Sequence, residues 1–150
     1  MQFFPTVAAF LALAATSVSA ACLEQIPLTP VFPIAYEIDT TINDAVSFGI
    51  PANSVGPCQL VAKFPAGYPI ISTGSDLVNV RAVDGPAAGA LVGDLRFRAG
   101  TTTVINSFAC RDVMSFELSL AEPTEGSRVS FSQIKGAGLF LEVGDCQISV

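Results

Sequence analysis

The chain has 150 residues, of which 51% are hydrophobic and only 13% charged, and its formal net charge is −6 at pH 7. This apolar composition excludes an intrinsically disordered chain, and the acidic balance argues against nucleic acid or an anionic membrane surface as a partner. The sequence contains no histidine, which removes Ser-His-Asp and Cys-His catalysis and all metal sites that use histidine.

The first predicted element is a secretory signal peptide over residues 1–20. An apolar run from Phe3 to Ala15 precedes a Val-Ser-Ala cleavage signature that ends at Ala20, and this run is too short to span a membrane. We expect the mature chain to begin near Ala21 and to form a single domain over 21–150. No later run is long enough to cross a bilayer, so no stable membrane insertion is predicted. The predicted location is extracellular or cell-wall associated.

The cysteines predict a disulfide framework. All four lie in the mature part, at Cys22, Cys58, Cys110 and Cys146. An even number of cysteines in an exported chain indicates two disulfides. Cys58 is in phase with Leu60 and Cys110 with Phe108, which favours a 58–110 bridge between strands of opposite sheets. The 22–146 bridge would then join the two ends, but a pairing of 22–58 with 110–146 stays open.

Short alternating runs, separated by turn residues, fill the mature sequence. The segment Leu23–Pro33 contains three prolines and is predicted to be an extended arm or an edge strand. In the later runs the residues expected to point inward are Val46, Phe48 and Ile50; Leu60, Ala62 and Phe64; Val78, Val80 and Ala82; Leu95 and Phe97; Met114, Phe116, Leu118 and Leu120; Val129 and Phe131; and Leu139, Leu141 and Val143. This period-two pattern predicts an all-β domain, an antiparallel β-sandwich of roughly eight short strands stabilised by disulfides.

Three segments carry a family resemblance. They are Val46–Pro51 (VSFGIP), followed by Gly56–Leu60 (GPCQL) and Lys63–Pro65 (KFP); Asn106–Cys110 (NSFAC); and Gly138–Glu142 (GLFLE), which leads to Cys146. Their order and spacing resemble the fungal But-two C-terminal-like domain over roughly residues 45–146. The resemblance implies an all-β, sandwich-like domain with no known enzymatic activity and no catalytic residues to carry over. The founding protein binds a subunit of an enzyme that activates ubiquitin-like modifiers, an intracellular partner that an exported chain would not meet.

Two tyrosines are the candidate binding residues. Tyr68 lies in the turn-rich stretch Phe64–Pro69, which either presents its ring to a partner or folds the ring over the sheet edge. Tyr36 lies in a predicted strand, and we expect its hydroxyl at the rim of the domain.

Charged side chains offer weaker candidates. Asp94, Arg96 and Arg98 share one strand face, which predicts either contact with an acidic partner or a solvated face with local ion pairs. Glycosidases use pairs of carboxylates, and candidate pairs are Glu37 with Asp39, Glu122 with Glu125, and Glu142 with Asp145. Calcium prefers oxygen ligands, which Asp39, Asp44 or Asp145 could supply. None of these lies in a recognisable motif, so we predict no catalytic residue, no metal and no cofactor.

The sequence therefore predicts a secreted, non-enzymatic binding module at the fungal cell surface or in the extracellular space, with an unidentified extracellular protein as its partner. The alternative is a structural cell-wall or matrix component, or a carbohydrate-binding one with a wall polymer as its partner. The absence of tryptophan argues against stacked sugar subsites. A small hydrolase that uses two carboxylates is the most distant alternative.

Overall fold

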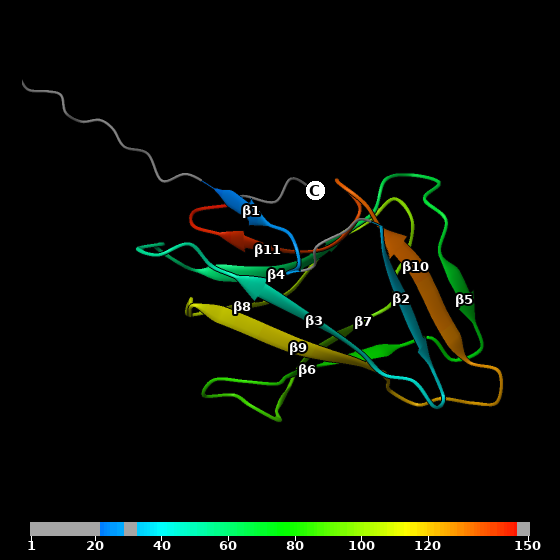
Figure 1. Cartoon of the computed structure of the whole chain (residues 1–150). Helices are drawn as coiled ribbons and strands as arrows, with labels where there is room; N and C mark the ends of the chain where they lie inside the picture. The colour runs from blue at the N-terminus through cyan, green and yellow to red at the C-terminus, as the bar shows by residue number, and fades with distance from the viewer. Residues whose placement is uncertain (1–21, 29–32, 147–150) are drawn as a thin grey trace, which may run out of the picture.

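The computed structural model describes residues 22–28 and 33–146, and in these ranges it contains eleven strands and no helix (Figure 1). In chain order the strands are β1 (Leu23–Gln25), β2 (Ile34–Asp39), β3 (Asp44–Gly49), β4 (Cys58–Lys63), β5 (Ile71–Thr73), β6 (Val78–Ala82), β7 (Leu91–Leu95), β8 (Thr102–Phe108), β9 (Val113–Leu120), β10 (Arg128–Gln133) and β11 (Gly138–Val143). No helix in the described part of the chain is long and apolar enough to cross a membrane. The predicted signal peptide lies outside the described residues.

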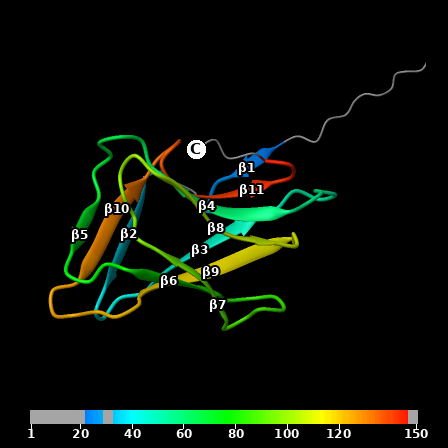
Figure 2. The same ribbon diagram turned by 180° about the vertical axis from the view of Figure 1, so that it is seen from behind.

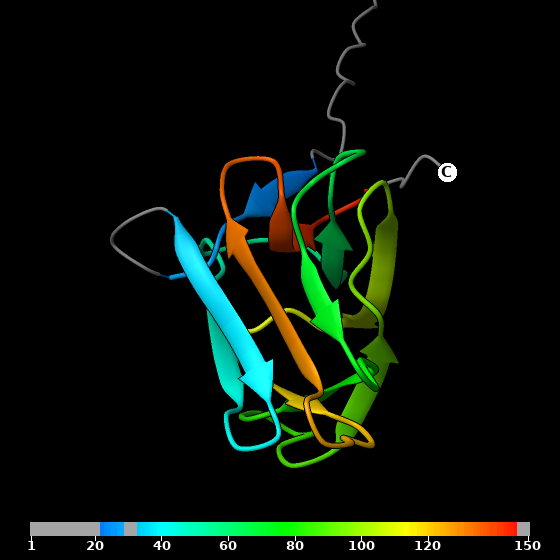
Figure 3. The same ribbon diagram turned by 90° about the vertical axis from the view of Figure 1, so that its right-hand side faces the viewer.

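The strands form three antiparallel sheets. Sheet A has the order β1-β11-β4-β8, sheet B the order β2-β10-β5, and sheet C the order β3-β9-β6-β7. Sheet A lies above sheet C in Figure 1, and sheet B closes the right-hand side of the space between them; Figure 3 shows sheet B from its outer side. Sheets A and C also approach each other at β7 and β8, on the side nearer the viewer in Figure 2, where Asn106 Nδ2 donates to the carbonyl oxygen of Val92 at 2.6 Å.

The hydrophobic core fills the space that the sheets enclose. Inward residues predicted from alternation are buried in β3, β4, β6, β9, β10 and β11, whereas Ile50 is only partly buried against the core. Aromatic rings join the sheets: Phe64 contacts Phe97 and Phe131 edge to face, with centroids 5.9 and 5.0 Å apart. The all-β, sandwich-like fold predicted from the sequence is confirmed, with eleven strands where roughly eight were expected.

Three strands, β1, β5 and β8, have a weak alternation signal. β1 and β5 are only three residues long, too short for a period of two to be read. In β8 the register with β4 shifts, because Leu60 pairs with Asn106 but Val61 pairs with Val104. Ile105 is the extra residue of this β-bulge, which interrupts the alternation along the strand. β1 is an edge strand of sheet A, as the proline-rich segment predicted, while residues 29–32 lie outside the described residues.

The disulfides pair Cys22 with Cys146 and Cys58 with Cys110, which is the pairing that the strand phase favoured. The first bridge joins the residue before β1 to a residue just after β11. The second joins the first residue of β4 to a residue that follows β8. Because β4 and β8 are neighbours in sheet A, the prediction that the 58–110 bridge links opposite sheets is wrong.

Candidate functional site: an apolar groove beside β8

An apolar groove is bordered by two connections between strands, which lie toward the left in Figure 1. It lies between the β6–β7 connection, residues 83–90, and the short segment 109–112 that joins β8 to β9. Its deepest residues are Met114 and Phe116 of β9, both almost fully buried, and the partly buried Phe108 at the end of β8. The groove therefore reaches the edge of the hydrophobic core.

Small side chains on the walls leave the groove open. Ala82, Pro86, Ala87 and Ala109 line it, and the cavity that they border has a volume of about 280 Å³. Side chains of this size cannot fill the space above three large core residues. Neither alternation nor spacing in the sequence reveals a space that side chains leave empty.

The polar rim of the groove is an ion pair. Arg111 Nη2 donates to Asp84 Oδ1 at 2.9 Å, and Arg111 Nη1 donates to the carbonyl oxygen of Val113 at 3.1 Å. The same carboxylate oxygen accepts the N–H of Ser115 at 3.2 Å. Burial raises the pKa of Asp84, but the hydrogen bonds from Arg111 and Ser115 outweigh it, so its pKa lies below the ordinary value. Both charges of the rim are thus compensated and fixed in place.

Gly85 allows this rim to form. Its φ of 78° lies in the left-handed region, and a Cβ built at this position would lie 2.3 Å from Cζ of Arg111. The guanidinium group therefore packs directly against the backbone of the β6–β7 connection. The rim joins segments that lie 27 residues apart in the sequence, so no local motif could have indicated it.

The two tyrosines predicted to bind a partner have different surroundings. The Tyr68 ring is half-buried against Phe64, with centroids 5.6 Å apart, and its hydroxyl donates to the carbonyl oxygen of Ser132. This is the second of the two predicted arrangements, a ring folded over the sheet edge. Shallow hollows beside Tyr68 leave part of the residue accessible.

Tyr36 does not reach the rim of the domain. It is 2% exposed and stacks on Phe131 with centroids 4.9 Å apart. Its hydroxyl has no hydrogen-bond partner among the described residues, and burial raises its pKa, with the nearby charge of Asp44 adding to the effect. The expectation of a hydroxyl at the rim is wrong because Tyr36 points inward in β2, in phase with the fully buried Ile38.

The basic residues after β7 form a local network. Arg98 Nη1 contacts Asp76 Oδ2 at 2.8 Å and Arg96 Nε contacts Asp76 Oδ1 at 3.1 Å, while Ser72 also donates to Asp76. Hydrogen bonding from Arg98 lowers the pKa of Asp76 to about 2, although burial opposes the shift. Local ion pairing was one of the two arrangements predicted for these arginines. The predicted third member of the face, Asp94, is exposed.

Asp76→Asn is expected to destabilise the chain by about 1–2 kcal/mol near neutral pH, because both arginines are about half exposed and solvent weakens their pairs. The folded-state pKa of Asp76 is lower than its unfolded value. Its contribution is therefore complete above about pH 4 and is lost as the pH falls through about 2. Urea titrations at pH 5 and pH 2 measure this difference, with Asp94→Asn as the control. Equal losses at both pH values would contradict the role of Asp76.

The predicted carboxylate pairs are dispersed among structural roles. Glu37 pairs with Arg128, and Asp39 Oδ1 accepts the N–H groups of Thr41 and Ile42 in the β2–β3 turn. Asp44 Oδ2 accepts the N–H of Glu37 at 3.0 Å. Glu122 and Glu125 are exposed in the β9–β10 connection.

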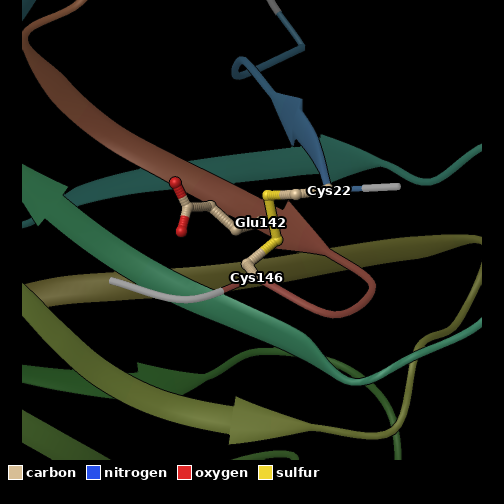
Figure 4. Close-up of side chains that lie close together, drawn as sticks. All are labelled: Cys22, Glu142 and Cys146. Atoms are coloured by element: carbon tan, nitrogen blue, oxygen red, sulfur yellow. A yellow bond between two sulfur atoms is a disulfide. The ribbon is translucent and has the colours of Figure 1, made fainter. Parts of the chain in front are cut away.

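A cluster of metal-ligand residue types lies beside β11. Cys22, Glu142 and Cys146 come together there, as Figure 4 shows. Both sulfur atoms belong to the disulfide, so neither is a thiolate ligand. Glu142 is buried while Asp145 is exposed, and no cluster among the described residues combines Asp39, Asp44 and Asp145.

Comparison of the chain with protein-family models, with curated proteins and with solved structures finds no match. The resemblance to the But-two C-terminal-like domain therefore stays a prediction based on the three segments that carry it.

Proposed function

We propose that the chain is a secreted, non-enzymatic protein-binding module, and that the groove beside β8 receives an apolar side chain of an extracellular partner polypeptide. The observation that carries this proposal is an apolar hollow that reaches Met114 and Phe116 and is bordered by a fixed ion pair. Export is supported by the signal-like residues 1–20 and is compatible with two disulfides, which persist in oxidising compartments.

The size of the groove favours a polypeptide over a small molecule. Typical small-molecule sites measure roughly 300–1,000 Å³ and enclose most of the ligand. A cavity of about 280 Å³ that is open to the surface suits one large apolar side chain instead. Such an anchor in a pocket, surrounded by polar groups that exclude water, is the usual centre of a protein–protein contact.

The chemistry of the rim agrees with a polypeptide occupant. Asp84 offers an acceptor and Arg111 offers donors on opposite sides of the same pair. These groups complement the N–H and C=O groups that flank any side chain of a peptide. The net charge of −6 favours a basic partner through long-range attraction.

The proposal predicts that filling the groove weakens binding. A random linear peptide library is selected on the oxidised chain, and one recovered peptide is then measured against two variants. Ala87→Trp places an indole in the groove, whereas Ala88→Trp adds the same ring at an exposed residue that does not line it. We expect Ala87→Trp to weaken the peptide at least about tenfold, since a buried anchor contributes about 2 kcal/mol or more, and Ala88→Trp to leave the Kd unchanged.

Three outcomes contradict the proposal. They are a library that yields no enriched peptide, recovered peptides that bind both variants equally, and a chain that instead co-sediments with insoluble chitin or glucan to the same extent in both variants. The last result supports the alternative role as a wall-polymer component. Thermal melts of both variants show that a lost interaction does not arise from unfolding.

A further inference from the structure

The disulfide between Cys22 and Cys146 joins the two ends of the described part of the chain. It lies at the edge of sheet A, where β1 pairs with β11. Cys22 is exposed and Cys146 is partly buried, whereas Cys58 of the other bridge is 0% exposed. Burial therefore protects the Cys22–Cys146 bridge less well than the Cys58–Cys110 bridge against thiols in the surrounding solution.

A buried carboxylate lies beside this bridge. Glu142 of β11 is 6% exposed, and one of its carboxylate oxygens lies within 4.8 Å of both sulfur atoms (Figure 4). The strand pairing fixes its backbone, because Glu142 lies across from Glu24 of β1 on one side and Gln59 of β4 on the other. Solvent screens charges at buried positions only weakly. The Glu142 carboxylate therefore acts strongly on the bridge.

The charges beside the bridge do not cancel. Lys63 Nζ lies 3.4 Å from Glu142 Oε2, and it also contacts the carboxylate of Glu24. One ammonium group is thus shared between two carboxylates. A further acidic residue, Asp145, directly precedes Cys146 in the chain. The surroundings of the bridge therefore carry a net negative charge.

Thiol exchange would form an anion at this place. A thiolate from solution attacks one sulfur of the bridge, the S–S bond breaks, and its electron pair leaves on the other sulfur as a thiolate, which takes a proton from water. A second thiolate then attacks the mixed disulfide, so that the reagent is oxidised to its own disulfide and the chain gains two thiols. Whichever sulfur is attacked first, the departing thiolate forms within 4.8 Å of a carboxylate oxygen of Glu142.

We propose that Glu142 protects the Cys22–Cys146 bridge against thiol exchange, because it holds a negative charge where the departing thiolate must form. Repulsion between two like charges a few ångströms apart raises the energy of the thiolate, so exchange becomes slower. Lys63 opposes this effect, since its ammonium group partly neutralises the carboxylate. The bridge thereby stays closed among thiols although Cys22 is exposed.

Protection of this bridge matters for the edge of sheet A. β1 is only three residues long, and β11 is its neighbour in the sheet. So short a strand forms few hydrogen bonds, and the covalent link next to it holds it in place at Cys22. Slow exchange therefore keeps the edge strand attached to β11.

The rate at which 2-mercaptoethanol reduces the oxidised chain tests the proposal, near a pH of about 8, where part of the reagent is thiolate. Free thiols are trapped with iodoacetamide at successive times, and mass spectrometry of the peptides follows Cys22 and Cys146 separately from the other bridge. We expect Glu142→Gln to accelerate their reduction by roughly three- to tenfold. The control Glu117→Gln removes the same charge from β9 in sheet C and should leave the rate unchanged.

A second variant, Lys63→Met, separates the electrostatic effect from a loosening of the fold. Glu142→Gln and Lys63→Met both remove the ion pair between β11 and β4, so loosening would accelerate reduction in both variants. The proposal predicts opposite signs, with slower reduction in Lys63→Met, because Glu142 and Glu24 then lose the ammonium group that they share. Faster reduction in both variants, an unchanged rate in Glu142→Gln, or an equal acceleration in Glu117→Gln would overturn the proposal.

Discussion

Leu118→Asp is expected to abolish the folded state, with a loss in the free energy of unfolding of more than about 4 kcal/mol. Leu118 is 0% exposed in β9, the strand that lies between β3 and β6 in sheet C. A carboxylate there would point into the core with no cationic partner within the enclosed cluster. Circular dichroism during urea denaturation measures the loss, and secretion of folded protein should fall in parallel.

The matched control lies one residue further along the same strand. Ser119→Asp adds the same charge to the outer face of sheet C, where Ser119 is only partly buried and pairs with Asn79 of β6. This variant should change the free energy of unfolding by less than about 1 kcal/mol. If the two variants unfold at the same urea concentration, the inward and outward faces assigned to β9 are wrong.

Removal of the Cys58–Cys110 bridge by Cys58→Ala/Cys110→Ala is expected to lower the free energy of unfolding by about 4 kcal/mol. The bridge closes a loop over a sequence separation of 52 residues, so it restricts the unfolded chain strongly. It also holds β4 to the segment that borders the groove, because Cys110 lies between Ala109 and Arg111. The groove and the stability of the domain thus depend on one covalent link.

Reductant separates the contributions of the two bridges. Wild-type chain in reductant loses both bridges, whereas the Cys58→Ala/Cys110→Ala variant without reductant retains Cys22–Cys146. We expect the variant to be intermediate in stability between the oxidised and the reduced wild type. A variant as stable as the oxidised wild type would contradict the role assigned to the 58–110 bridge.

The fold was largely predictable because long, regular alternation is a strong signal. In β9 the residues Met114, Phe116, Leu118 and Leu120 alternate without interruption, and all four are buried. The pattern was weak where the chain departs from a regular strand, as at the bulge around Ile105 in β8. Phase alone also did not distinguish neighbouring strands of one sheet from opposite sheets, which is why the surroundings of the Cys58–Cys110 bridge were mispredicted.

The candidate site was not predictable from the sequence. Its residues come from β6, the β6–β7 connection, β8, the segment that joins β8 to β9, and β9, and its defining property is a space that Ala87 and Ala109 leave unfilled. Sequence reasoning instead favoured tyrosines, because aromatic residues are common at binding surfaces. Tyr36 instead lies inside the domain. Its ring is buried against Phe131, and its hydroxyl is therefore buried as well.

The central claim is that the groove beside β8 holds an apolar side chain of a polypeptide, and Met114 provides a direct reporter for it. The chain contains only two methionines, the other being Met1 in the predicted signal peptide, so a labelled methyl group of Met114 can be assigned without ambiguity. Our account predicts intermolecular Overhauser effects between this methyl group and an apolar side chain of a library-selected peptide. A bound peptide that leaves the Met114 resonance unshifted and shows no such effects would contradict the account.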